Sequence, residues 1–308
     1  MSAFFALILK LIPLYSLIFL GFIADRFLKV KKEAISPLLI YLIAPIVVFQ
    51  GIVSRDFTAS ILLIPFVFLA IALITSLSYF FLFKNSWQDP TRNVLAFSVG
   101  ACNAGYFGLP IILMLFGHEA LQVVVMAIFS VQFFEITFGF YIMARGQYSP
   151  KASLMKLLKL PTIYAFALGL ILNACGYRAE GSIQEFFTLF KGAYSVLGMM
   201  LIGLALSSVK RQTFDYKFLT LAMVGKFILW PLFMFSFILL DQHFFHLYDI
   251  FTYKILMILS SVPIAANTVA FATQLEARPD KAAAVVVLST MIALVFLPLM
   301  VGIVLNFS

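Results

Sequence analysis

The chain has 308 residues, of which 63% are hydrophobic and only 11% are charged, and its formal net charge is +8. A soluble domain carries about 25% charged residues, so a water-soluble fold of this length could not bury so much apolar surface. The composition therefore excludes a soluble globular protein and predicts an integral membrane protein that works inside the bilayer.

Ten apolar runs follow one another along the chain, each long enough to cross a bilayer as a helix, which takes about 20 residues. Polar breaks such as Asp25–Arg26 and Ser54–Asp56 separate the runs. They lack the alternation of apolar and polar residues that is typical of barrel strands, so an all-α fold is expected. The ten predicted transmembrane helices span residues 3–24, 35–53, 59–83, 92–117, 119–144, 160–176, 188–207, 218–240, 250–275 and 282–306.

The distribution of Lys and Arg predicts the direction of these helices, because cytoplasmic connections carry most of the basic residues. The five odd-numbered connections hold four, two, four, three and two basic residues in turn, whereas the even-numbered ones hold only Arg55 and Arg178. We therefore expect a multi-pass protein of the cell (inner) membrane with both termini on the non-cytoplasmic side. The positive charge is spread over short loops, which argues against a nucleic-acid partner.

Two similar halves, residues 1–150 and 151–308, are expected to form one membrane domain. Five predicted helices lie on each side of the polar connection 145–159. Because five is odd, the halves must enter the membrane in opposite directions, as in an inverted repeat. Pro110 interrupts the fourth span and Pro263 the ninth, at corresponding places in the two halves.

The fourth and ninth spans are expected to be broken near these prolines. Proline removes a backbone donor from a helix, and three glycines that precede Pro110 lower the cost of unwinding. Half-helices that begin near Pro110 and Pro263 would aim their partly positive N-terminal ends at the bilayer centre, which favours an anion. Plain packing kinks are the alternative, since proline is common in membrane helices.

Residues beside the two breaks are the candidate substrate-binding group. Asparagine supplies both donors and an acceptor, although hydrogen bonds between packed helices would use the same groups. The candidates are Asn103, Gly105, Tyr106, Pro110, Pro263, Asn267 and Thr268.

Glu135 is the one acidic residue deep inside a predicted span, and Gln132 lies on the same helix face one turn earlier. An ionisable group at this depth is a functional candidate by default. Glu135 and Gln132 are therefore the candidate ion-coupling residues. A hydrogen-bonded glutamate that only holds helices together is the alternative.

Lys226 is the deepest basic residue, in the eighth span. It could pair with Glu135, attract the anion as its partner, or extend its stem to the cytoplasmic interface. The three histidines and two cysteines form no metal-ligand pattern, and no phosphate-binding loop or nucleophile motif is present. We therefore expect no metal, no cofactor, no catalytic residues and no enzymatic activity.

The segment Asn103–Pro110, which reads NAGYFGLP, resembles the fourth-helix motif of the auxin efflux carrier family. That family includes plant PIN-type carriers and many bacterial permeases. Residues 21–26, 44–45 and 262–298 resemble other parts of the family, so the likeness covers essentially the whole chain. The resemblance implies ten helices in two inverted sets of five, with broken fourth and ninth helices that cross at a central site.

The resemblance also implies transport of organic anions, such as auxin in plants and dicarboxylates in bacteria. This chain lacks the long cytoplasmic loop of many plant members, which argues against auxin itself. The leading hypothesis is a secondary active transporter, or permease, for small organic anions such as carboxylates, with a proton as the candidate coupling ion. Two alternatives stay open: a sodium-coupled organic anion symporter of the bile-acid-symporter type, and a membrane receptor that does not transport. A homodimer is one option for the assembly in the lipid bilayer.

Overall fold

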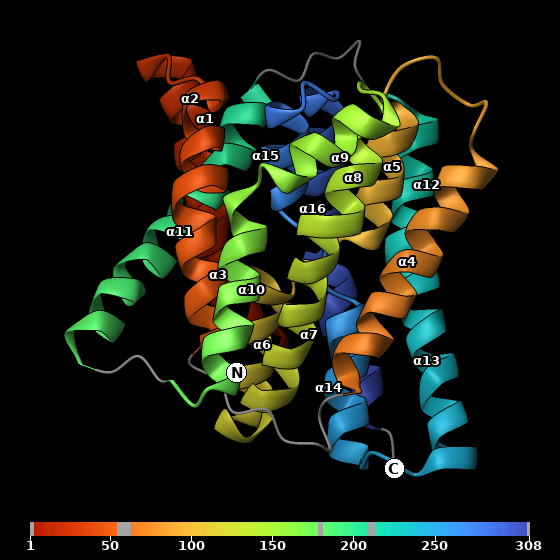
Figure 1. The fold of residues 1–308 in the computed structure, drawn as a ribbon. Helices are drawn as coiled ribbons and strands as arrows, with labels where there is room; N and C mark the ends of the chain where they lie inside the picture. The colour runs from red at the N-terminus through yellow and green to blue at the C-terminus, as the bar shows by residue number, and fades with distance from the viewer. Residues whose placement is uncertain (1–2, 54–62, 178–180, 208–213, 307–308) are drawn as a thin grey trace.

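The structure is a computed structural model that describes residues 3–53, 63–177, 181–207 and 214–306 (Figure 1). These residues are almost entirely helical and contain no strand. The elements of the first half are α1 (Ala3–Leu28), α2 (Lys32–Pro37), η1 (Leu38–Ile43), α3 (Ala44–Val53), α4 (Ile64–Leu82), α5 (Thr91–Gly100), η3 (Ala104–Gly108), α6 (Leu109–Phe116), η4 (His118–Ala120), α7 (Leu121–Phe134), η5 (Glu135–Gly139) and α8 (Phe140–Ala144).

The second half begins with the short helix α9, which precedes the longer helix α10. Its elements are α9 (Pro150–Leu158), α10 (Pro161–Ala174), α11 (Ser182–Ser207), α12 (Tyr216–Val224), η7 (Gly225–Leu229), α13 (Trp230–Leu240), η8 (Asp241–Phe245), α14 (Ile250–Ser260), α15 (Asn267–Gln274) and α16 (Pro279–Leu305).

Six continuous helices in the described residues are long and apolar enough to cross a membrane, and a seventh is added if α9 and α10, bent by 53°, count as one span. The chain is therefore an all-helical, multi-pass membrane protein, as the composition predicted. The count of ten crossings stays a prediction. The predicted fourth and ninth spans are each divided into two shorter helices, so neither is a continuous crossing helix.

The connections lie at the two ends of the helix bundle. Figure 1 places the connections from α4 to α5, from α8 to α9 and from α15 to α16 at the same end, and the chain's C-terminus at the opposite end. A hydrogen bond joins two of these connections, because Gln147 Nε2 donates to the Glu276 carbonyl oxygen at 2.7 Å.

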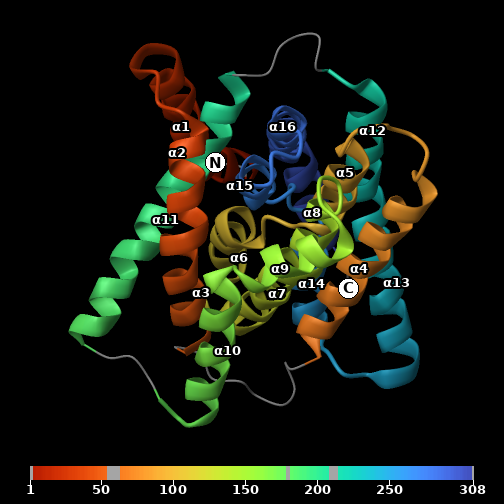
Figure 2. The ribbon, with the colours of Figure 1, turned by 45° about the horizontal axis from the view of Figure 1, so that its top comes forward.

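The helices form two groups, which we call the scaffold group and the crossing group. In the scaffold group, α1 packs along α11 and α3 packs along α10. The crossing group holds α4 to α8 and α12 to α16, in which α4 packs on α5 and α7, and α13 on α14. Figure 2 shows α1, α3 and α11 on one side and α4 and α13 on the other.

Two glycines allow the closest helix approach in the scaffold group. A Cβ atom built at Gly203 of α11 would lie 1.9 Å from the carbonyl oxygen of Ile18 in α1. A Cβ atom at Gly21 of α1 would lie 2.0 Å from the carbonyl oxygen of Met200. Small residues let membrane helices pack backbone against backbone, so these positions fix α1 on α11.

An ionic network ties two connections of the crossing group to the start of α16. Asp215 caps α12 by accepting from Phe218 N at 3.0 Å, and it also accepts from Lys281 Nζ at 2.9 Å and Trp87 Nε1 at 2.6 Å. Partial burial alone would raise the pKa of the Asp215 carboxyl, but these hydrogen bonds and the Lys281 charge lower it below its ordinary value. Asp215 is therefore ionised at neutral pH and holds α12 against the start of α16.

Gly203→Ala is expected to separate α1 from α11, because the added methyl carbon collides with the backbone of α1. Overpacking of this kind costs about 1–3 kcal/mol, so the thermal unfolding midpoint of the purified protein should fall by several degrees. Gly192→Ala, on the same helix, is the matched control, because no atom lies within 4 Å of its added carbon. Equal midpoints for the two variants would contradict the close contact.

Candidate functional site

The first break lies upstream of the proline that signals it. Helix α5 ends at Gly100, and Ala101 adopts an extended backbone conformation, with φ −85° and ψ 145°. Helical structure resumes at Ala104, and Pro110 occupies the first turn of α6. Pro110 is the second residue of α6, which directly follows the π-helical turn η3 (Ala104–Gly108). The chain is therefore unwound at residues 101–103 and not at Pro110 itself.

The second break contains its proline. Residues 261–266 between α14 and α15 are not helical, and Pro263 lies inside this segment. Helix α15 then begins at Asn267. Asn103 is the last residue of the first break and Asn267 is the first residue after the second, so the two amides stand at similar places although their spacing from the prolines differs.

The two breaks touch each other. The Asn103 backbone N–H donates to the Pro263 carbonyl oxygen at 2.8 Å. The Ile264 N–H donates to Ser289 Oγ of α16 at 3.2 Å. Backbone groups freed from a helix inside a membrane must find partners in the protein or in a water-filled cavity, and the crossing supplies these partners.

A cavity of about 300 Å³ lies beside the crossing, between the scaffold group and the crossing group. Most of its wall is apolar, with α3, α7 and α11 contributing side chains. A mostly apolar pocket with a few converging polar groups is the usual form of a small-molecule site. The polar side chains that line it are Gln50, Asn103, Gln132, Glu135, Lys191, Tyr194, Ser195 and Asn267.

A chain of hydrogen bonds fixes the orientation of Asn267 in the cavity wall. The Tyr194 hydroxyl of α11 donates to Asn267 Oδ1 at 2.8 Å. Asn267 Nδ2 in turn donates to Glu135 Oε2 at 2.7 Å. Glu135 is only 2% exposed, so this hydrogen bond offsets part of the cost of burying its carboxyl. The contact joins both groups of helices through one residue.

The predicted site residues fall into two sets. Six of them line the cavity: Asn103, Gly105, Pro110, Gln132, Glu135 and Asn267. The others do not: Pro263 lies within the second break, Thr268 is fully buried just after it, and Lys226 is fully buried behind the wall. The side chain of Tyr106 lies outside what the structure describes.

Sequence analysis did not single out three polar residues of α11 that line the cavity. Lys191, Tyr194 and Ser195 are spaced i, i+3 and i+4 and therefore share one face of the helix. This spacing was the available signal, but Lys191 reads equally well as an interfacial lysine because it lies toward the start of α11. Only the packing of α11 beside the crossing turns this face toward a cavity.

Within the described residues, no three His, Cys, Asp or Glu side chains gather as metal ligands. The polar groups that line the cavity are amide, hydroxyl, carboxyl and ammonium groups around an apolar pocket. A multi-pass helical protein with broken helices and a cavity at their crossing belongs to the general class of membrane carriers.

A comparison with known protein families agrees with the assignment to the membrane carriers. The model of a family described as membrane transport protein matches residues 6–153 and 149–301. The chain therefore belongs to this family, the auxin efflux carrier or PIN-type membrane transport family, whose members are transporters. Among curated proteins, none matches the chain significantly.

Tyr194→Phe is expected to weaken binding of the transported solute about five- to tenfold, because losing one hydrogen bond of about 1 kcal/mol frees the Asn267 amide to turn. The dissociation constant, measured by titration of the purified protein, checks this. Tyr164→Phe is the control, since its hydroxyl donates to the Leu158 carbonyl oxygen at 2.8 Å on the protein surface. An equal effect of the two variants would show that the hydroxyl does not organise the site.

Proposed function

We propose that the protein is a secondary active transporter, a permease of the inner membrane, that carries small organic anions such as carboxylates. One observation carries the proposal: the two broken segments meet at a cavity of about 300 Å³. Asn103, whose backbone N–H donates to the Pro263 carbonyl oxygen of the other break, and Asn267 both lie in the cavity wall. Broken helices at a central cavity are the usual position of a substrate site in secondary transporters.

An anion is the solute that the electrostatics of this cavity favour. The helical segments after the two breaks begin at Ala104 and Asn267, and both residues line the cavity. The N-terminal end of a helix carries partial positive charge. Lys191 of α11 brings a basic side chain to the opposite wall. A carboxylate would thus lie between two helix starts and one ammonium group.

The proposed fold has ten crossings, arranged as two inverted repeats of residues 1–150 and 151–308. The packing supports this arrangement. The first predicted span, α1, packs on the seventh, α11, and the sixth, α10, packs on the second span through α3. Exchanging the two halves converts one of these pairs into the other, as a twofold axis between repeats would.

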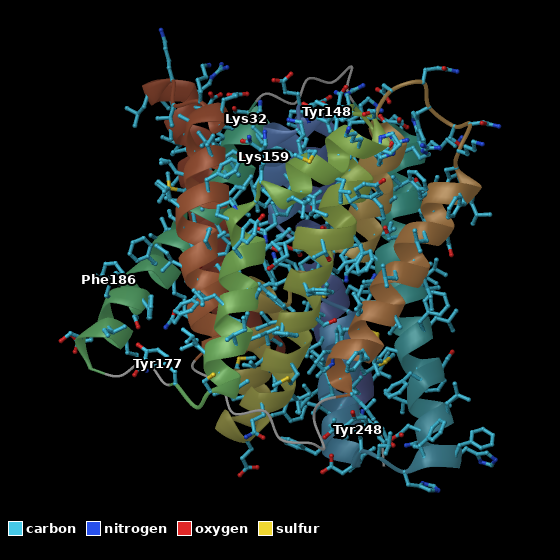
Figure 3. All side chains as sticks on the ribbon, viewed as in Figure 1. Lys32, Tyr148, Lys159, Tyr177, Phe186 and Tyr248 are labelled. Carbon is cyan, nitrogen blue, oxygen red and sulfur yellow. The ribbon has the colours of Figure 1, made fainter. Side chains whose placement is uncertain are left out.

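The proposed direction places the basic connections in the cytoplasm and both termini outside. Figure 3 shows Lys32 and Lys159 toward one end of the bundle, whereas Tyr177 and Tyr248 lie toward the other. This separation supports the charge bias of the loops, in which Lys and Arg mark the cytoplasmic side.

The proposed mechanism is alternating access, with the crossing group moving against the scaffold group. The cavity supports it, because its two walls come from different groups: Gln50 and Lys191 from the scaffold, and Asn103 and Glu135 from the crossing group. A relative shift of the groups would expose the same cavity to either side of the membrane in turn.

A panel of organic acids tests the function. We expect at least one small carboxylate to raise the unfolding midpoint of the purified protein and to accumulate in proteoliposomes. Asn267→Ala should abolish both effects, whereas Asn306→Ala, whose amide only contacts the Gly302 carbonyl oxygen at 2.9 Å, should preserve them. No stabilisation by any anion, together with background uptake, would refute the proposal. Exchange of sodium for choline and counterflow of labelled solute separate this carrier from a sodium symporter and from a receptor.

Proton coupling through Glu135, supported by Gln132 on the same wall, is the second part of the proposal. A carboxylate substrate beside Glu135 is repelled unless Glu135 carries a proton, so the two would travel together. Glu135→Gln should remove pH-driven accumulation while counterflow continues, because the amide keeps the shape of the wall. Glu119→Gln is the control at an exposed acid. Full pH-driven accumulation by Glu135→Gln would rule out the proton role.

A further inference from the structure

A second, smaller cavity lies next to the large one, and the two cavities share part of their walls. The large cavity has a volume of about 300 Å³ and the small one a volume of about 20 Å³. The small cavity has room for about one water molecule, so a carboxylate solute fits the large cavity and not the small one. The residues that line both cavities are Gln132, Glu135, Tyr194 and Asn267.

Three of these four shared residues are joined by hydrogen bonds, and we call them the septum. The Tyr194 hydroxyl donates to Asn267 Oδ1 at 2.8 Å, and Asn267 Nδ2 donates to Glu135 Oε2 at 2.7 Å. Tyr194 belongs to α11 of the scaffold group, whereas Asn267 and Glu135 belong to the crossing group. A shift of one group against the other therefore has to stretch or break the bond between Tyr194 and Asn267.

The small cavity lies on the proposed cytoplasmic side of the septum. In η1 and α3 it is lined by residues within 39–48, whereas the large cavity is lined by residues within 47–52, which lie farther along the chain from Lys32. Ile136 and Ala270 also line the small cavity, and their helices run on to the connections from α8 to α9 and from α15 to α16. Figure 1 places these connections at one end of the bundle, and Figure 3 places Lys32 at the same end.

The two cavities differ in how they reach the surface of the bundle. The large cavity has exposed residues in its wall, Gly51 near the end of α3 and Lys191 near the start of α11. The small cavity is walled mostly by buried side chains. Beside it, Ser36 Oγ of α2 donates to the Ala270 carbonyl oxygen of α15 at 2.8 Å, and both residues are buried. The large cavity is thus open toward the proposed outer end, and the small one is closed toward the cytoplasm.

We propose that the septum is the closed inner gate of the carrier, and that the structure is the outward-open state. The inference rests on the proposed transport function and names the residues that separate a bound solute from the cytoplasm. A solute enters the large cavity from the outer side and stops at Asn267 and Glu135. When the crossing group shifts, the Tyr194 bond breaks, and the small cavity widens into the path toward the cytoplasm.

Cysteine labelling tests the gate without any solute. In a parent variant that lacks both native cysteines, Cys102 and Cys175, an added Thr162→Cys reports on the small cavity and an added Gln50→Cys on the large one. A membrane-impermeant maleimide is applied to vesicles of known orientation. It should modify Gln50→Cys from the non-cytoplasmic side, and it should modify Thr162→Cys only slowly, from the cytoplasmic side.

Tyr194→Phe removes the hydroxyl that holds the gate closed. It should raise the cytoplasmic labelling rate of Thr162→Cys about fivefold, because that rate follows the population of the open state and one hydrogen bond of about 1 kcal/mol is lost. Tyr79→Phe is the matched control and should leave the rate unchanged, since its hydroxyl donates to the Leu221 carbonyl oxygen at 3.0 Å within the crossing group. Ala270→Cys gives a second reporter in the small cavity if Thr162→Cys does not fold.

Two results would overturn the gate. One is a Tyr194→Phe variant in which Thr162→Cys reacts no faster than in the parent or in Tyr79→Phe. The other is a parent in which Thr162→Cys reacts from the cytoplasm as fast as Gln50→Cys reacts from outside. A protein that accumulates a carboxylate but gives either result loses only the gate, whereas the expected labelling without uptake of any anion refutes the transport function alone.

Discussion

The backbone contact between the two breaks is the constraint on which the rest of this protein depends. Unwound backbone inside a membrane has no water to bind, so its N–H and carbonyl groups need partners within the protein. The bond from Asn103 N to the Pro263 carbonyl oxygen meets this need, and Ser289 meets it for Ile264. Because the breaks satisfy each other, two distant parts of the chain are held together, and their amide side chains reach one cavity.

The polar groups at the crossing form a chain of hydrogen bonds. Tyr194 orients Asn267, and Asn267 binds Glu135. Each buried group in the series lowers the cost of burying the next, since an isolated polar group or charge in apolar surroundings is expensive. The hydrogen bonds among these side chains therefore set which polar groups the cavity presents to a solute.

The scaffold group gives this site a second, independent wall. Its helices are held by packing of backbone against backbone at Gly21 and Gly203, which involves no part of the crossing. The hydrogen bond from Tyr194 to Asn267 links the two groups at the cavity. A side-chain hydrogen bond contributes only about 1 kcal/mol, so it can be broken and remade far more easily than the glycine contacts. The fold thus joins two packed groups of helices by a single side-chain hydrogen bond at this wall of the cavity, while α11 packs on α16 elsewhere.

The sequence by itself determined the membrane character, the helical fold and the two regions of weak helix, because hydropathy and the chemistry of proline and glycine act locally. It also pointed to Asn103, Asn267 and Glu135, since polar residues stand out in apolar runs. Tertiary structure alone decided that the first break lies at residues 101–103, that Lys191 and Tyr194 face the cavity, and that Lys226 lies behind it. The physical reason is that a membrane helix is apolar on all sides, so its sequence does not distinguish the face toward lipid from the face toward protein.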